Sequence, residues 1–192
     1  MEPNFLNITW NRFCFLGYLL SHKIKTAGNN FDLIITIARG GLTISQILSD
    51  SLKLPIASFT VQSYKDLKQD KLPHITYGLS ADLSQKRILL CDDICDTGKT
   101  FERGLAYLND LGVDKTQVKT CCLHFKPHSS FKPNYFVEET SAWVIYPYEV
   151  RETMEQVYPL WKKQNISSMV IKERFLSWEF PKKQVEDFLN QH

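Results

Sequence analysis

The chain has 192 residues, 43% hydrophobic and 23% charged, which excludes a disordered protein and predicts one globular domain with a substantial core. Its 23 lysines and arginines nearly balance 21 acidic residues, and the formal charge of +2 is too small for binding nucleic acid through the net field. Any phosphate that the protein binds must therefore be held locally.

No apolar stretch approaches the roughly 18 residues of a membrane helix, and the amino terminus carries no basic region followed by an apolar segment. We therefore expect no membrane contact, no export and a cytoplasmic location. The five cysteines include no C-x-x-C pair and no histidine at zinc spacing, which predicts reduced thiols. They are Cys14, Cys91, Cys95, Cys121 and Cys122.

Hydrophobic periodicity predicts helices and strands that alternate along most of the chain. Apolar residues recur at three-to-four spacing from Trp10 to Ile24, after Thr9 as a candidate N-cap, and predict an opening helix. We expect this helix to end near Gly28. The first half of the chain then contains a strand at 31–38, a helix to about residue 52, a strand at 55–61 and a polar loop or arm at 62–80. The second half contains a strand at 87–94, a helix at 100–111, strands at 118–125 and near 143–146, and helices within 151–192. Such alternation predicts an α/β fold with a doubly wound, mainly parallel sheet flanked by helices, which binds ligands at the carboxyl ends of its strands.

The most informative segment is a hydrophobic strand at 88–91 followed by acids, a turn of small residues and a helix. Backbone N–H groups of residues 96–100 can hold a phosphate at the helix start, where the helix dipole also favours an anion. Gly98 permits the unusual φ that such a turn needs, and Lys99 and Thr100 can assist. The segment therefore predicts an anion site.

The tripeptide at 98–100 also matches the end of a nucleotide-triphosphate P-loop, but Asp93 stands where the first P-loop glycine would fall. Asp92, Asp93 and Asp96 together would repel a bare polyphosphate. Carboxylates instead accept hydrogen bonds from sugar hydroxyls, and one or two of them suit Mg²⁺ with water and phosphate oxygens. The pattern favours a phosphorylated sugar with a hydrated cation, and a kinase or NTPase ranks last.

Two acids followed by Asp-Thr-Gly-x-Thr after a strand resemble the phosphoribosyl pyrophosphate signature of type I phosphoribosyltransferases. The resemblance covers most of residues 31–150. It implies that Asp92 and Asp93 position the ribose hydroxyls and a Mg²⁺ ion, and that Asp96 is the catalytic acid/base facing the purine N7. The residues that would bind phosphoribosyl pyrophosphate are Arg39, Gly40, Asp92, Asp93, Asp96, Thr97, Gly98, Lys99 and Thr100.

Two further segments resemble the purine branch of this family. Residues 38–42 resemble its pyrophosphate loop, in which an Arg-Gly peptide, here Arg39-Gly40, turns its backbone toward the leaving group. Ser63-Tyr64 resembles the pair that opens the flexible catalytic loop of the 6-oxopurine enzymes, where a mobile lid excludes water. These matches narrow the resemblance to the purine branch of the family.

Two later segments, Phe125 to Pro127 and Trp143 to Glu149, resemble the base pocket of xanthine-guanine and hypoxanthine phosphoribosyltransferases. Lys126 would meet the purine 6-oxygen, since lysine donates hydrogen bonds and accepts none. Trp143 would stack on the ring, the Val144 carbonyl would accept the N1 proton, and Glu149 falls where the family carries an acid near base and metal. None of the five histidines falls in a motif, and none receives a catalytic role.

The resemblance implies transfer of the 5-phosphoribosyl group from phosphoribosyl pyrophosphate to a 6-oxopurine, with release of pyrophosphate, in purine salvage. It implies a phosphoribosyltransferase domain at 1–150, with a small hood from the N-terminal and post-Trp143 segments, and a helical extension at 151–192 packed on the same domain. We expect a homodimer or higher homo-oligomer. Two alternatives stay open: a regulator on the same fold that binds phosphoribosyl pyrophosphate and nucleic acid without catalysis, and a transferase for a pyrimidine or other acceptor.

Overall fold

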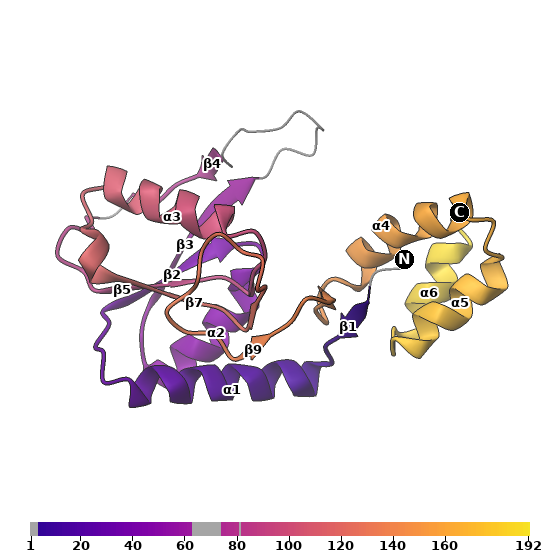
Figure 1. Cartoon of the computed structure of the whole chain (residues 1–192), viewed down its shortest axis with the longest axis horizontal. Helices are drawn as coiled ribbons and strands as arrows, with labels where there is room; N and C mark the ends of the chain where they lie inside the picture. The colour runs from indigo at the N-terminus through magenta and orange to yellow at the C-terminus, as the bar shows by residue number, and fades with distance from the viewer. Residues whose placement is uncertain (1–3, 63–73, 81) are drawn as a thin grey trace. The chain divides into compact units, whose positions relative to one another are not determined.

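The computed structural model describes residues 4–62, 74–80 and 82–192, and the chain divides into two compact units (Figure 1). The core unit is Cys14–Ser141, and the terminal unit combines Met1–Phe13 with Ala142–His192. This division differs from the segments 1–150 and 151–192 expected above, because residues 142–150 belong with the helices that follow them. The first helix, α1 (Trp10–Thr26), begins in the terminal unit and continues into the core unit.

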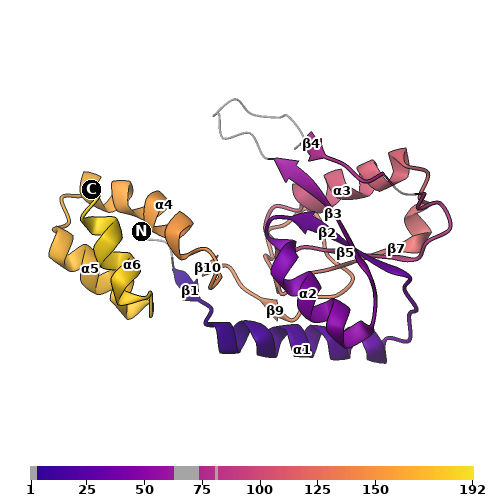
Figure 2. The same cartoon turned by 180° about the vertical axis from the view of Figure 1, so that it is seen from behind.

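The core unit is built on a five-stranded sheet with the order β4-β3-β2-β5-β7, parallel except for β4, which runs antiparallel to β3. Its strands are β2 (Leu33–Ala38), β3 (Ile56–Gln62), β4 (His74–Tyr77), β5 (Ile88–Cys91) and β7 (Val118–Cys121). Figures 1 and 2 show α2 (Gly41–Leu52) on one face and α3 (Lys99–Asp110) on the other. The expected doubly wound α/β fold is confirmed.

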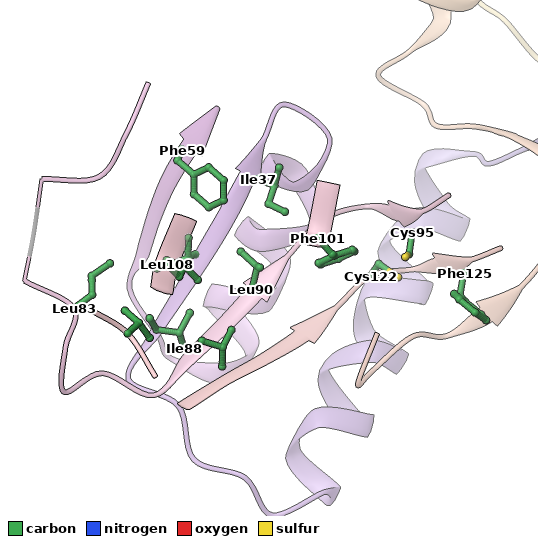
Figure 3. Close-up of a cluster of buried hydrophobic side chains, with 13 residues drawn as sticks. Ile37, Phe59, Leu83, Ile88, Leu90, Cys95, Phe101, Leu108, Cys122 and Phe125 are labelled. Carbon is green, nitrogen blue, oxygen red and sulfur yellow. The ribbon is translucent and has the colours of Figure 1, made fainter. Parts of the chain in front are cut away.

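The apolar runs of the central strands explain their place in the sheet. All four residues of β5 are buried, as are the middle four of β2, which is the pattern of strands covered on both faces. The side chains that pack between this sheet and α3 form a continuous cluster (Figure 3). They include Ile37, Phe59, Leu90, Phe101 and Leu108.

Two strands expected as single runs are each divided. The run at 87–94 ends as β5 and resumes as β6 (Ile94–Cys95), and the run at 118–125 ends as β7 and resumes as β8 (His124–Phe125). The second pieces form a small parallel sheet with β9 (Glu138–Glu139), in the order β6-β8-β9. Asp92 and Asp93 thus lie between the main sheet and the small one, at the carboxyl end of β5.

The prediction of a loop or arm at 62–80 was wrong for residues 74–77, because these residues form β4. Three of its four side chains are exposed and the fourth is half-buried, so the strand carries no hydrophobic alternation that the sequence could reveal. Ser63 and Tyr64, expected to open a flexible catalytic loop, lie outside the described residues. A 3-10 turn at Lys115–Gln117 precedes β7.

The terminal unit pairs β1 (Phe5–Asn7) in parallel with β10 (Trp143–Ile145). The strand expected near 143 is therefore present, but its partner is an N-terminal strand that the sequence analysis did not predict. Helices α4 (Val150–Lys163), α5 (Ser168–Ser177) and α6 (Lys182–Leu189) confirm the helices expected after residue 150. They pack around aromatic and aliphatic side chains, among them Trp161, Phe175 and Phe188.

The cysteines are free, and Cys14 alone among these five is exposed. Across the described ranges, none of the helices is both long enough and apolar enough to span a bilayer.

Candidate active site

The loop after β6 has the geometry of an anion cradle. Residues 96–98 connect β6 to α3, and Gly98 adopts a left-handed conformation with φ +90° and ψ −18° at the N-cap of the helix. A Cβ on Gly98 would lie 2.6 Å from Phe131 Cβ and 2.8 Å from Phe131 N. Both the backbone angle and the close approach therefore require glycine at this position.

The N–H groups of this loop are available to a ligand. Within the described part of the chain, the backbone N–H groups of Thr97, Gly98 and Thr100 donate to no protein acceptor. Glu102 donates to the Gly98 carbonyl at 3.0 Å and is the first helical residue to do so. Free N–H groups at a helix start, together with the helix dipole, make a phosphate site.

The acid pair Asp92–Asp93 is buried beside this loop. The Asp93 N–H donates to Asp92 Oδ1 at 3.0 Å. Burial raises the pKa of Asp92 well above its ordinary value, and the neighbouring Asp93 carboxylate raises it further. Hydroxyl donors or a cation would therefore stabilise the ionised pair.

The turn after β2 lies against the same acids. A Cβ on Gly40 would stand 2.7 Å from both carboxylate oxygens of Asp93, and one on Gly41 would stand 2.6 Å from the Cys91 carbonyl. Arg39, whose side chain is exposed, precedes this contact, and the Ala38–Arg39 peptide is cis. The structure thus brings the predicted pyrophosphate turn and the acid pair together.

The acid pair fits a magnesium ion only with help from a substrate. No cluster of three or more His, Cys, Asp or Glu side chains that could hold a metal occurs in the described ranges. Mg²⁺ commonly takes one or two carboxylates and completes its shell with water and phosphate oxygens. Asp92 and Asp93 supply that number of ligands.

Asp96 and Lys126 leave paired strands at the same end of the small sheet. Strands β6 and β8 are parallel with Cys95 opposite Phe125, so the next residues along each strand are Asp96 and Lys126. The Lys126 N–H donates to the Cys95 carbonyl at 2.9 Å, and the Lys126 residue is only 7% exposed. A donor and a carboxylate therefore stand at adjacent strand ends, where the loop at 96–98 begins.

His128 is a site residue that the sequence analysis missed. Its Nε2 lies 3.0 Å from Asp96 Oδ1. A lone histidine two positions after Lys126 matches no motif. The pairing of β6 with β8 brings it to Asp96, and the sequence of neither strand predicts that pairing. The only sequence signal was its nearness to Lys126.

The other predicted base-site residues belong to the terminal unit. Trp143 is 45% exposed and lies opposite Phe5 in the β1–β10 pair, whereas Val144 is buried. The Glu149 carboxylate accepts the Tyr146 N–H at 2.9 Å, so it closes the turn that precedes α4. Their roles toward a base stay predictions.

The sequence profile of the phosphoribosyl transferase domain matches residues 16–153. The chain belongs to that family. The crystal structure of a purine phosphoribosyltransferase from Pyrococcus horikoshii is similar to this phosphoribosyl transferase domain at 34% identity and a TM-score of 0.66, covering 75% of this chain and 93% of that one. The predicted family and its purine branch are thereby confirmed.

Curated relatives of this phosphoribosyl transferase domain carry different functions. The transcriptional regulator GfcR of Methanothrix thermoacetophila is 23% identical over 128 residues, which is 60% of this chain and 62% of that protein. The orotate phosphoribosyltransferase of Sulfurisphaera tokodaii is 32% identical over 90 residues, 47% of this chain and 42% of that protein. The chain thus spans less than two thirds of these relatives, and the acceptor base is a matter for proposal.

Proposed function

We propose that this phosphoribosyl transferase domain transfers the 5-phosphoribosyl group from phosphoribosyl pyrophosphate to N9 of a 6-oxopurine, as in purine salvage. The observation that carries the proposal is the position of Asp96 and the buried Lys126 at adjacent ends of β6 and β8, beside the phosphate loop. This arrangement supplies a proton acceptor and a carbonyl-directed donor at one strand edge.

The sugar phosphate would bind through the loop and the acid pair. Free N–H groups at Thr97, Gly98 and Thr100 suit the 5-phosphate, and Asp92 and Asp93 suit the two ribose hydroxyls. The backbone of the Arg39-Gly40 turn, which lies against Asp93, suits the pyrophosphate. A Mg²⁺ ion bound with the substrate would supply positive charge to the leaving group.

The chemistry requires the C1′–oxygen bond of the pyrophosphate ester to break while the purine N9 forms a bond to C1′. The pyrophosphate leaves with the electron pair, and the N7 proton of the purine passes to the Asp96 carboxylate. Removing that proton raises electron density on N9 and makes it a better nucleophile. Lys126 would donate to the 6-oxygen, on which negative charge grows as the proton leaves.

Lys126 also favours the purine class. An ammonium group has three donors and no acceptor, so it pairs with a 6-oxo group and leaves a 6-amino group without a partner. The roles that the sequence predicts for Trp143, Val144 and Glu149 stay separate predictions, and a Trp143→Ala variant assayed on the same acceptors tests the stacking role.

A panel of acceptors tests the proposal. Hypoxanthine, guanine, xanthine, adenine, uracil and orotate are each incubated with phosphoribosyl pyrophosphate and Mg²⁺, and nucleotide and pyrophosphate are measured. We expect turnover on at least one 6-oxopurine and none on uracil or orotate. Turnover restricted to a pyrimidine would refute the acceptor class. Absence of turnover on every base, together with salt-sensitive binding of DNA or RNA, would identify a regulator instead.

A further inference from the structure

We propose that His128 is a positioning residue that holds the Asp96 carboxylate in the orientation needed for proton transfer. The inference deepens the proposed function and rests on it. Its observation is the 3.0 Å contact between His128 Nε2 and Asp96 Oδ1, made by two side chains that are each more than half exposed.

The direction of this hydrogen bond follows from the chemistry of the two groups. An ionised carboxylate only accepts, so the Nε2 of His128 carries the proton and donates it to Oδ1. That contact occupies Oδ1 and leaves Oδ2 of Asp96 as the oxygen that would take the N7 proton. His128 keeps its own proton throughout, and only Asp96 changes protonation in the transfer step.

Backbone hydrogen bonds on both sides fix the pair. The carbonyls of Cys95 and Thr97, which flank Asp96, accept the N–H groups of Lys126 at 2.9 Å and Ser130 at 3.2 Å, two residues before and two residues after His128. The two chain segments are therefore hydrogen-bonded to each other on both sides of the contact. Little movement of either backbone is available to separate the imidazole from the carboxylate.

Side-chain bonds strengthen the same connection. The Ser130 hydroxyl lies 3.0 Å from both the Thr97 carbonyl and a Glu102 carboxylate oxygen on α3. Ser129 donates its N–H to the Lys126 carbonyl at 3.0 Å, which closes the turn that carries His128. The segment after Lys126 is thus anchored to the phosphate loop and to the helix behind it.

A role in folding explains the pair poorly. A polar contact between two exposed side chains contributes little to stability, because water competes for both groups and both lose rotamer freedom. The carboxylate, by contrast, would be free to rotate without His128, since its side chain is 57% exposed. Holding one rotamer matters for a group that must meet a substrate atom at hydrogen-bond distance.

Two variants that differ by one methylene test the inference. In His128→Gln the amide nitrogen can stand where Nε2 stands, whereas in His128→Asn it falls short of Asp96. On a 6-oxopurine that the wild type uses, we expect His128→Asn to lower kcat about tenfold, the effect of one lost hydrogen bond to a charged group, with the KM for phosphoribosyl pyrophosphate changed less than twofold. His128→Gln should keep kcat within about threefold of wild type.

The double variant Asp96→Asn/His128→Asn shows whether His128 acts through Asp96. We expect it to be no slower than Asp96→Asn alone, because the group that His128 positions is already gone. Unchanged kcat in His128→Asn, equal losses in the Gln and Asn variants, or a further tenfold loss in the double variant would each overturn the inference while leaving the proposed function intact.

A measurement on the free protein separates the two proposals. At fixed pH, Asp96→Asn should shift the imidazole NMR signals of His128 and leave those of His22, on α1, unchanged. An unmoved His128 signal would show that the pair does not form and would overturn the inference. If Asp96→Asn shifts the His128 signal but the wild-type protein turns over no base, the contact between the two side chains is supported. The proposed function is then refuted, and with it the role of His128 in catalysis.

Discussion

Replacing Gly98 with alanine tests whether the loop at 96–100 is the phosphate cradle. A φ of +90° costs an L-residue roughly 1–2 kcal/mol. The new Cβ would also stand 2.6 Å from Phe131 Cβ, and Phe131 stacks on Phe101 of α3 with ring centroids 5.5 Å apart, so it cannot simply move aside. Overpacking of this kind adds roughly 1–3 kcal/mol, and we expect a total loss of about 2–5 kcal/mol in the unfolding free energy of the core unit.

Gly112→Ala is the matched control. Gly112 has a φ of +81°, close to that of Gly98, but a Cβ there would meet nothing within 4 Å. This variant should lose only the backbone contribution, about 1 kcal/mol after the gain from a stiffer unfolded chain. The difference between the two variants therefore measures the steric overlap with Phe131.

Urea unfolding followed by far-UV circular dichroism is the assay, because the core unit contains no tryptophan. The four tryptophans are Trp10, Trp143, Trp161 and Trp178, and all lie in the terminal unit. Phosphoribosyl pyrophosphate with Mg²⁺ at about 100 times its Kd should stabilise wild type and Gly112→Ala by about 2.7 kcal/mol. If Gly98→Ala weakens binding 100-fold, the same concentration adds only about 0.4 kcal/mol.

Ligand stabilisation of Gly98→Ala equal to that of Gly112→Ala would refute the reasoning, since the loop would then accept a side chain and a shifted backbone without losing its ligand. Equal unfolding free energies of the two variants would show that the Phe131 contact exerts no constraint.

Three further changes test other parts of the site and the fold. Asp96→Asn should bind phosphoribosyl pyrophosphate with a Kd near that of wild type and lose about 10²–10⁴ in kcat, measured by calorimetry and turnover. Lys126→Met should lower the ratio of kcat/KM for 6-oxo over 6-amino purines by about 5- to 150-fold, because an unpaired buried oxygen costs about 1–3 kcal/mol. The Arg87 side chain and backbone N–H hold the pKa of Asp32 below its ordinary value; a lowered pKa stabilises the protein above about pH 4 and that contribution is lost as the pH falls further. In urea titrations, Asp32→Asn should therefore unfold at a lower urea concentration than wild type from pH 8 to 5. The difference between the two midpoints should shrink below pH 4.

Each of these has a contrary result that is simple to recognise. Near-normal turnover in Asp96→Asn would remove the acid/base role without touching the fold. Unchanged base selectivity in Lys126→Met would move the base pocket away from the end of β8. A gap between wild type and Asp32→Asn that widens toward pH 3 would reverse the sign of the ion-pair argument.

Local patterns predicted much of this protein. The buried runs of β2 and β5, the glycine turn after β2 and the acids before α3 were all readable, because each depends on residues close together in the sequence. The conformation of the loop at 96–98 was likewise predicted, since the left-handed Gly98 and the free N–H groups of a helix start are properties of one short segment. Phosphate binding by this loop stays a prediction.

Features that depend on pairing between distant segments escaped prediction. The break between β5 and β6 falls at Asp92 and Asp93, and two acids alone do not show that the chain leaves one sheet and enters another. That outcome depends on the pairing of β6 with β8, about 30 residues later in the chain. Strand β4 has mostly exposed side chains and lies at the edge of the sheet as described, paired with β3, so no hydrophobic periodicity marks it. β1 has three residues, and nothing local shows that it joins β10, more than 130 residues later in the chain.

The sequence by itself determined the chemistry of the acid-rich loop and the alternation of strands and helices, because both arise from residue type and short-range spacing. The tertiary structure alone decided which strand ends meet. It brought Gly40 against Asp93, Lys126 beside Asp96, and His128 onto the same carboxylate. Strand pairing is fixed by the packing of whole sheets and their registers, and no segment carries that information by itself.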